Sequence, residues 1–447
     1  MTGEGRRQTV VIVGAGLAGL AAAVTLTRAG VPVQLLEAAD RVGGRVQTLR
    51  EPFDDGLYAE AGGEFVDGGH QILHAFLQEY QLPLLPIPAG QRLTRFDGVV
   101  RRGELLTDLG PEAAQDEARI AQETTALAAR IADPSRAWEA APDLDSQSVS
   151  AWLEGLGISR LARLYQHAWR TVDYGVEPDR LSLLQLARDE RLWHQAPALQ
   201  SGRVQGGMDR LPRAMAAELG DRLTLAARVT AIRQDDRAIH VEYVHAGSMA
   251  SVEADYAVLA VPPPALRGIV LDPQPDGPRR DALEQLQMGQ ITKVLIQVRR
   301  RFWEDHGVNG RALTDGLVQA TYETTAGQPG QRAVLTVYTG DRTAAAVAAL
   351  PESERLAACA RELEELYPGC SSEIERAVTV PWDASSASGG AYSHFRPGDL
   401  TRFGPWLAQP FGRLHLAGEH TDQWQATMNG ALASGVRAAE EIRACQR

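Results

Sequence analysis

Cysteine is scarce in this chain of 447 residues. The three cysteines, Cys359, Cys370 and Cys445, are an odd number and lack the close spacing of metal ligands. His70 and His74 lie four residues apart, as on one helix face, but no third ligand accompanies them. We therefore expect no disulfide framework and no metal site, and the cysteine pattern is typical of a reducing, cytoplasmic location.

Long hydrophobic runs are missing as well. No stretch approaches the roughly 20 apolar residues of a membrane span, and residues 2–8 are polar rather than a signal sequence. An excess of positive charge is also absent, because the formal net charge is −12. We expect neither a nucleic acid nor a membrane as a partner. The length and mixed composition predict a globular protein of two domains.

A glycine-rich turn is the most informative feature that the sequence does contain. Gly14, Gly16 and Gly19 stand between an apolar run at 9–13 and a helix-like run at 20–29. Gly14 allows the tight turn, Gly16 lets the backbone approach a pyrophosphate, and Gly19 lets the helix pack close to the sheet. The N-terminus of that helix offers unpaired N–H groups to phosphate oxygens. The turn predicts an adenine dinucleotide site.

A second apolar run, residues 33–36, ends in Glu37. A carboxylate about 20 residues after the glycines accepts hydrogen bonds from a ribose 2′-hydroxyl, which argues against the 2′-phosphate of NADP. The same unit makes Ala15, Ala18 and Ala38 candidate cofactor contacts.

The character of the chain changes after this unit. A mainly helical insertion spans about 86–200, with helices expected at 111–132, 149–155 and 161–171. Further helices are expected at 211–219, 352–366 and 429–443. Strands are expected at 222–233, 238–243, 257–261, 291–299, 333–338 and 413–417.

The opening unit, extended by Arg41–Arg45, resembles the FAD-binding start of the flavin-containing amine oxidases. That family includes monoamine oxidases, polyamine oxidases and L-amino-acid oxidases. Further motifs resemble those of the family, in the same order, across nearly the whole chain. They are Ala59–Phe65, Gly206–Met208, Arg228–Thr230, Gly289–Lys293, Trp382–Tyr392 and Ala417–Ala431.

The resemblance implies an α/β fold, in which a Rossmann-type FAD-binding domain is assembled from three chain segments and accompanied by an α+β substrate domain. The FAD-binding domain is expected at 1–80, 203–280 and 381–447. The substrate-binding domain, with its helical insertion, is expected at 81–202 and 281–380.

The resemblance also implies cofactor contacts. Gly62 and Gly63 would pass beside the flavin, the Val229 backbone would meet the adenine, and Arg45 would reach the pyrophosphate. Glu419 is either a simple helix cap or part of a segment that covers the ribityl chain. The other contacts implied are Gly44, Glu64, Phe65, Trp382, Gly418, Thr427 and Met428.

Lys293 and Tyr392 are the catalytic candidates. The resemblance implies that Lys293 is buried and holds a water against flavin N5, whereas a lone lysine in an apolar strand otherwise lies on an exposed face. Tyr392 would hold an amine against its aromatic face, or it is an ordinary core tyrosine.

Two positions depart from the mitochondrial monoamine oxidases. Ala391 replaces the cysteine that bonds to their flavin, so we expect FAD to be held non-covalently. Thr427 replaces the second tyrosine beside the amine. Trp424 is a candidate to form that side of the substrate site, or it is an ordinary core residue. Tyr392, Trp424 and Thr427 are therefore the predicted substrate contacts.

The activity implied is oxidation of the C–N bond of an amine, with hydride transfer to flavin N5, hydrolysis of the imine and reduction of O2 to hydrogen peroxide. The partners are a small amine and O2, and a homodimer is left open. Three alternatives remain. The chain could be an L-amino-acid oxidase, although no arginine follows the glycine pair and an arginine elsewhere, such as Arg170 or Arg95, would have to bind the carboxylate. It could be a C–C desaturase or protoporphyrinogen-type oxidase, or a non-catalytic FAD-binding protein.

Overall fold

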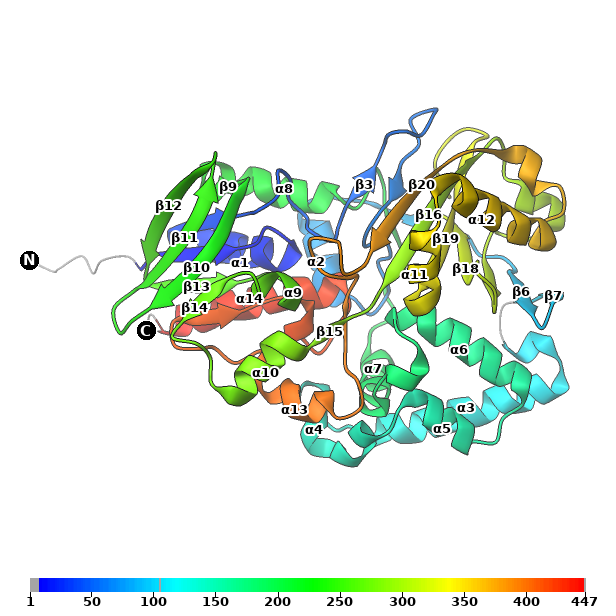
Figure 1. Ribbon diagram of the computed structural model, residues 1–447, viewed down its shortest axis with the longest axis horizontal. Coiled ribbons are helices and arrows are strands. Elements are labelled where there is room, and N and C mark those ends of the chain that lie inside the picture. The colour runs from blue at the N-terminus through cyan, green and yellow to red at the C-terminus, as the bar shows by residue number, and fades with distance from the viewer. Residues whose placement is uncertain (1–7, 104–105, 446–447) are drawn as a thin grey trace, which may run out of the picture.

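The computed structural model describes residues 8–103 and 106–445, and its elements form two regions side by side (Figure 1). The region on the left of Figure 1 contains the N-terminal strands and the C-terminal helix α14 (Met428–Cys445). The region on the right contains a large mixed sheet with a layer of helices below it. No helix within these residues has both the length and the apolar character needed to cross a bilayer.

Five parallel strands form the sheet of the first region, in the order β22-β13-β1-β2-β9. Val10 and Ile12 of the central strand pack toward α1 (Leu17–Arg28), whereas Val11 and Val13 pack toward the second sheet. Both faces are covered, which explains the unbroken apolar run of this strand. The bounds are β1 Val10–Val13, β2 Val33–Leu36, β9 Leu223–Thr224, β13 Tyr256–Leu259 and β22 Leu414–Leu416.

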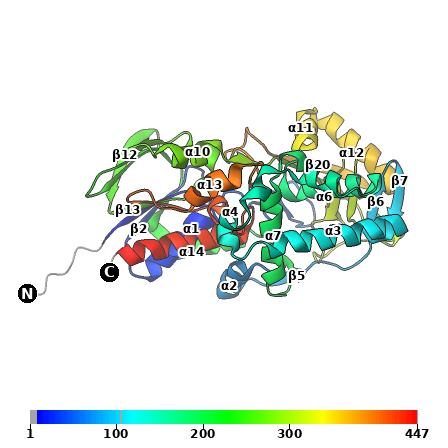
Figure 2. The ribbon, with the colours of Figure 1, turned by 90° about the horizontal axis from the view of Figure 1, so that it is seen from below.

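These strands come from residues 10–36, 223–259 and 414–416, which confirms the predicted Rossmann-type α/β fold assembled from three segments. The exact limits of the two domains stay a prediction. Figure 2 shows α14 lying along α1. Gly435 makes this approach possible, because a Cβ there would meet the Ala18 carbonyl oxygen at 2.1 Å. The second sheet, β12-β11-β10-β14, comprises β10 Ala227–Gln234, β11 Ile239–His245, β12 Ser248–Ala254 and β14 Val270–Asp272.

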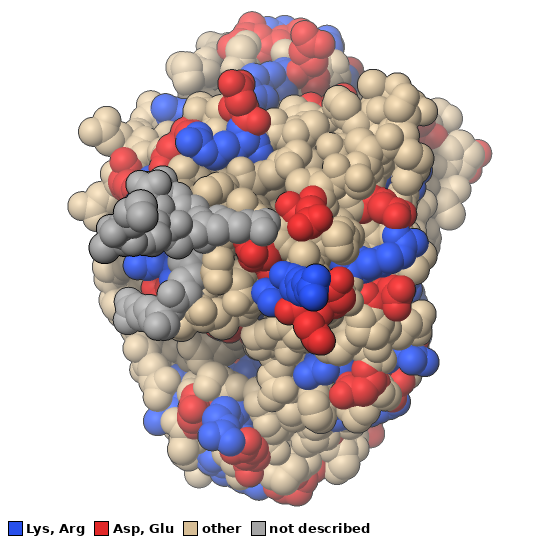
Figure 3. Space-filling view, turned by 90° about the vertical axis from the view of Figure 1, so that its left-hand side faces the viewer, with Lys and Arg blue, Asp and Glu red and all other residues tan. Residues whose placement is uncertain are grey.

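The strand expected over 222–233 is interrupted at Ala226, whose φ of +52° breaks the extended chain. Before this residue the chain pairs with β2, and after it the chain enters the second sheet. On the face shown in Figure 3, acidic and basic side chains are interspersed among uncharged ones.

Seven strands form the sheet of the other region, in the order β20-β16-β19-β18-β17-β6-β7. Lys293 in β16 is directly opposite Tyr338 in β19 and Val380 in β20. The bounds are β6 Leu93–Phe96, β7 Val99–Arg102, β16 Ile291–Val298, β17 Ala312–Thr314, β18 Ala320–Glu323, β19 Ala333–Gly340 and β20 Ile374–Trp382.

The three helices expected in the insertion form, although α3 ends three residues earlier and α6 three residues later than expected. The insertion also contains strands β6 and β7 and helices α4 and α7, which the sequence did not predict. Ser159 and Ser182 cap α6 and α7 through their hydroxyl oxygens, and Gly175 ends α6 with a φ of +65°. The helices here are α3 Pro111–Ala129, α4 Ala137–Ala140, α5 Val149–Gly155, α6 Arg160–Tyr174 and α7 Leu183–Gln195. The remaining helices are α2 Gln71–Glu79, α8 Arg210–Leu219, α9 Pro263–Leu266, α10 Gly277–Gln285, α11 Asp341–Ala349, α12 Glu352–Leu366 and α13 Asp399–Leu407. Short two-stranded sheets pair β3 Thr48–Leu49 with β4 Ala59–Glu60, β5 Leu84–Pro86 with β8 Gly202–Val204, and β15 Gln287–Met288 with β21 Ser393–His394.

Candidate active site

A cavity of about 1240 Å³ extends from the glycine turn of the first region to the seven-stranded sheet and helices α6 and α7 of the second. Most of the predicted site residues line it. They are Gly14, Gly16, Ala18, Glu37, Ala38, Gly44, Arg45, Gly62, Gly63, Glu64, Phe65, Val229, Lys293, Trp382, Tyr392, Gly418, Glu419, Trp424, Thr427 and Met428.

Ala15 and Gly19 lie behind this lining and support it. The Ala15 N–H donates to Oε2 of Glu37 at 2.5 Å, so the turn holds the acidic side chain in place. Helix α1 packs closely against the turn at Gly19. A Cβ on Gly19 would lie 1.8 Å from the Gly14 carbonyl oxygen, so a side chain there would clash with the turn. A Cβ on Gly16, in contrast, would meet no atom within 4 Å, and Gly16 lines the cavity. This open cradle at a helix N-terminus fits the pyrophosphate of a dinucleotide.

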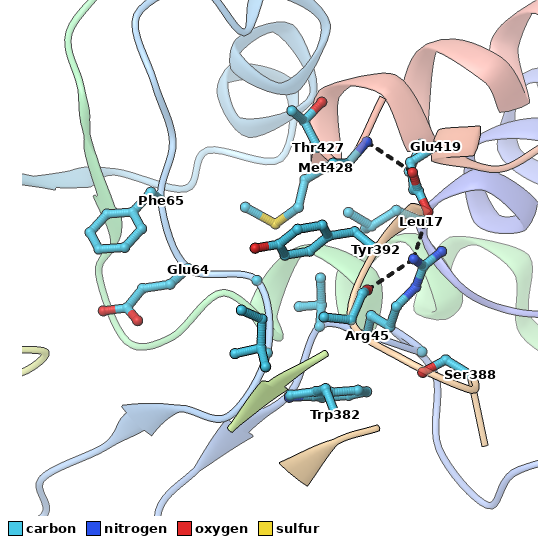
Figure 4. Close-up of a pocket in the computed structure, with 18 of the residues that line it drawn as sticks. Leu17, Arg45, Glu64, Phe65, Trp382, Ser388, Tyr392, Glu419, Thr427 and Met428 are labelled. Atoms are coloured by element: carbon cyan, nitrogen blue, oxygen red, sulfur yellow. Dashed lines mark hydrogen bonds and ion pairs between the residues drawn. The ribbon is translucent and has the colours of Figure 1, made fainter. Parts of the chain in front are cut away.

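An ion pair between Arg45 and Glu419 connects an N-terminal segment to a C-terminal segment at the cavity (Figure 4). Arg45 Nη1 donates to Glu419 Oε1 at 2.7 Å and to the Ala391 carbonyl oxygen at 3.0 Å. Glu419 also accepts from the Ser393 hydroxyl and the Ala426 N–H. Burial opposes ionisation of Glu419, but the charge of Arg45 and these hydrogen bonds lower its pKa overall. Contact of Arg45 with a pyrophosphate stays a prediction.

Lys293 is buried, with 3% of its surface exposed, so the exposed-face alternative does not apply. Its Nζ donates to the carbonyl oxygens of Glu60 at 3.0 Å and Gly62 at 2.9 Å, and to Oε2 of Glu64 at 3.2 Å. These three acceptors match the three N–H donors of an ammonium group. The water contact implied by the resemblance stays a prediction.

Glu64 is the centre of a buried polar network. Besides Lys293, its carboxylate accepts from Arg203 Nε at 2.7 Å, from the Thr324 hydroxyl at 2.7 Å and from the Tyr322 hydroxyl at 2.9 Å. Burial would raise the pKa of Glu64, but the charges of Lys293 and Arg203 lower it overall. The sequence reasoning missed Arg203 and Tyr322, because their approach to Glu64 depends on the tertiary fold.

The cavity-facing side of the seven-stranded sheet carries tyrosines. Tyr338, directly opposite Lys293, lies on the same sheet face, and its hydroxyl is 3.3 Å from that of Tyr392. The ring of Tyr322 lies 6.2 Å from that of Tyr338. Burial raises the pKa of Tyr338 and of Tyr392, so both remain neutral phenols. Tyr338 is the last residue of a strand that the sequence predicts. Nothing in the sequence near Tyr338 indicates that it pairs with Lys293.

Thr427 and Trp424 precede helix α14 in the chain, and both line the cavity. The Thr427 hydroxyl donates to the Trp424 carbonyl at 2.7 Å and accepts from the Gly430 N–H, so it caps α14. Trp424 packs edge-to-face against Trp193, with ring centroids 5.0 Å apart, and against His70 at 5.5 Å. Substrate contact by Trp424 and Thr427 stays a prediction. Within residues 8–103 and 106–445, no cluster of His, Cys, Asp or Glu has a metal-binding arrangement.

Charged side chains from α6 and α7 line the end of the cavity near Trp193. Arg170 Nη2 lies 3.5 Å from Glu190 Oε1, and its Nε has no hydrogen-bond partner. Asp173 is open to the cavity but enclosed by protein, and this burial raises its pKa to about 6, with Arg170 opposing the rise. Arg95, the other arginine considered for a carboxylate, lies outside the lining and pairs with Glu362 and Glu365.

Comparisons with known proteins agree with this geometry. The family described as flavin containing amine oxidoreductase matches residues 17–443. The chain is 29% identical to the L-amino acid dehydrogenase of Synechocystis sp., over 97% of this chain and 94% of that protein. The structure of putrescine oxidase bound to putrescine is 27% identical, with a TM-score of 0.87 over 98% of this chain and 99% of that one. Cyclohexylamine oxidase from Brevibacterium oxydans IH-35A is 26% identical, with a TM-score of 0.87 over 99% of this chain and 100% of that one.

The glycine turn, the cavity wall and the whole-chain match lead to one assignment. This chain belongs to the flavin-containing amine oxidoreductase family and is an oxidoreductase that acts on amines.

Proposed function

We propose that the chain binds FAD without a covalent bond and oxidises a small amine at its C–N bond, with O2 as the electron acceptor and hydrogen peroxide as a product. One observation carries this proposal: the glycine turn at Gly14–Gly19 and the wall of Lys293, Tyr338 and Tyr392 open into one continuous cavity. The amines named for the two structural neighbours support an amine substrate.

Non-covalent binding is supported by Ala391. Its backbone accepts from Arg45 and its side chain lines the cavity, where it offers no nucleophile. FAD is supported over NADP by Glu37, whose carboxylate is held at the turn by the N–H groups of Ala15 and Ala39.

When bound, the flavin supplies the acceptor for a hydride equivalent and the reaction with O2. The chain supplies placement and electrostatics. The rings of Tyr392 and Tyr338 hold the amine through their aromatic faces. The side chain of Lys293 lies beside the Gly62 turn and donates to its carbonyl oxygen. The enclosing sheet and helices limit the access of water, so the imine is hydrolysed after it leaves the site.

An L-amino acid is the second candidate substrate, and Arg170 is the observation that favours it. Arg170 is buried in the cavity wall, and a guanidinium group binds a carboxylate well. We favour an amine because Glu190 already pairs with Arg170 and Asp173 lies beside it, so a substrate carboxylate would meet repulsion. The charged residues of α6 and α7 also argue against a C–C desaturase, which needs an apolar cavity.

Anaerobic titration tests the proposal. Purified protein is mixed with a panel of amines and L-amino acids, and the flavin absorbance near about 450 nm is followed. We expect amines to bleach the flavin and L-amino acids to leave it oxidised. Acid precipitation should release all FAD into solution. Protein that carries no flavin overturns the proposal, and bleaching by L-amino acids alone replaces the amine with the second candidate.

A further inference from the structure

Two buried cations, Lys293 and Arg203, share one buried carboxylate in the cavity wall. Lys293 Nζ lies 3.2 Å from Glu64 Oε2, and Arg203 Nε lies 2.7 Å from Glu64 Oε1. The side chains are 4%, 9% and 1% exposed for Lys293, Arg203 and Glu64, respectively. Charges so far removed from water act on their surroundings more strongly than charges at a surface.

The position of Glu64 is set from the other side as well. The Thr324 hydroxyl donates to Oε1 at 2.7 Å, and the Tyr322 hydroxyl donates to Oε2 at 2.9 Å. Lys293 is held equally firmly, because its other two N–H groups donate to the Glu60 and Gly62 carbonyl oxygens. Of the three acceptors around Lys293, only Glu64 carries a negative charge. The distance between charge and counter-charge is therefore fixed by the network.

We propose that Glu64 is a positioning residue that lowers the reduction potential of the flavin by neutralising part of the charge of Lys293 and Arg203. This inference rests on the proposed function and on the expectation, implied by the family resemblance, that the flavin lies beside Gly62 and Gly63. A reduced flavin carries more negative charge than an oxidised one, so nearby cations stabilise the reduced form. The carboxylate of Glu64 offsets that stabilisation.

The test is a set of midpoint potentials, measured on flavin-loaded protein by equilibration with redox dyes. Glu64→Gln removes the negative charge and should raise the potential. Lys293→Met removes a positive charge and should lower it. The double variant has the net charge of the wild type and should lie near it. Each single change should alter the protein's preference for reduced over oxidised flavin by about tenfold. For a two-electron couple, this corresponds to a shift of about 30 mV in the midpoint potential.

Thr324→Val is the matched control, because it removes a hydrogen bond to Glu64 and leaves every charge in place. We expect no shift in its potential. A merely structural role of Glu64 would move the potentials of Thr324→Val, Glu64→Gln and Lys293→Met in one direction, without cancellation in the double variant. An unchanged potential in Glu64→Gln, or a double variant that matches Glu64→Gln, overturns the inference.

Glu64→Gln leaves two buried cations without a counter-charge, which is destabilising. Where this variant does not fold, Lys293→Met compared with the double variant makes the same test, since the double variant must have the higher potential. Wild-type protein without flavin overturns the proposed function and this inference together. If amines reduce the flavin of the wild type but the midpoint potentials of the variants do not follow the expected order, this inference alone is overturned.

Discussion

Arg45 and Glu419 are 374 positions apart in the chain, yet Nη1 of Arg45 lies 2.7 Å from Oε1 of Glu419. Arg45 follows Gly43 and Gly44 in the N-terminal unit, and Glu419 follows β22, the last strand of the parallel sheet along the chain. Glu419 in turn binds the backbone of Ser393 and Ala426. This ion pair therefore joins three separate segments of the cavity lining.

Replacing Arg45 with Met should lower the free energy of unfolding by about 2 kcal/mol, because the buried Glu419 loses its counter-charge while Arg45 itself is partly exposed. Urea unfolding of the flavin-free protein measures this. Arg41→Met is the control, since Arg41 bonds mainly to neutral backbone carbonyls and should cost about 1 kcal/mol. An Arg45→Met variant as stable as the wild type would contradict the prediction.

Gly16→Ala should separate cofactor binding from folding. Its φ of −70° suits alanine, and the new Cβ meets no protein atom within 4 Å. The variant should unfold like the flavin-free wild type but retain little FAD, measured from flavin absorbance per protein. In Gly19→Ala, the free energy of unfolding should instead fall by about 3 kcal/mol or more, because the new Cβ would lie 1.8 Å from the Gly14 carbonyl oxygen. Normal FAD content in Gly16→Ala would show that no phosphate lies there.

Tyr392 should contribute through its ring more than through its hydroxyl, whose two contacts, with Tyr338 and Val172, are both 3.3 Å long. Tyr392→Phe should change the dissociation constant of the amine by less than about threefold. Tyr392→Leu should raise it about tenfold, because the aromatic face is lost. Anaerobic flavin reduction at varied amine concentration gives these constants. Equal effects of the two variants would assign the role to the hydroxyl.

The affinity for a cationic amine should fall in acid. Burial raises the pKa of Asp173 to about 6, so the carboxyl group is ionised above this pH and neutral below it. Attraction of a cation is thus present above pH 6 and lost as the pH falls. KM should rise a few fold between pH 7 and pH 5, and Asp173→Asn should remove this rise. Glu190→Gln is the control, because Glu190 already pairs with Arg170. The same pH profile in wild type and Asp173→Asn would exclude Asp173.

Stability should depend on pH through Glu60. Burial raises the pKa of Glu60 to about 7, from 4.5 in an unfolded chain. Between these values the unfolded state releases a proton that the folded state keeps, so stability falls as the pH rises through this window. Between pH 4.5 and pH 7, the free energy of unfolding of Glu60→Gln should rise by about 3 kcal/mol relative to that of the wild type. Urea unfolding across this range measures the gain, and parallel curves would refute it.

The sequence predicted the glycine turn between β1 and α1 well because its determinants are local. A buried strand, three glycines, a helix and Glu37 lie within a short stretch, and each has its own steric or electrostatic requirement. Helices α3, α5 and α6 of the insertion and the strand at 291–299 were also recognisable from periodicity and apolar runs. The resemblance added the distant motifs, including Lys293 and Tyr392, and the absence of a nucleophile at Ala391.

Only the tertiary structure decided which charges meet. Nothing local to Lys293 indicates Glu64 as its partner, and nothing near Arg203 indicates that it shares that carboxylate. The pairing of Lys293 with Tyr338 depends on strand register, which is set by long-range packing of the sheet. The sequence by itself determined the glycine turn, which we propose receives a dinucleotide. The fold determined the electrostatic surroundings of the reaction, because burial and distance exist only once remote segments have packed together.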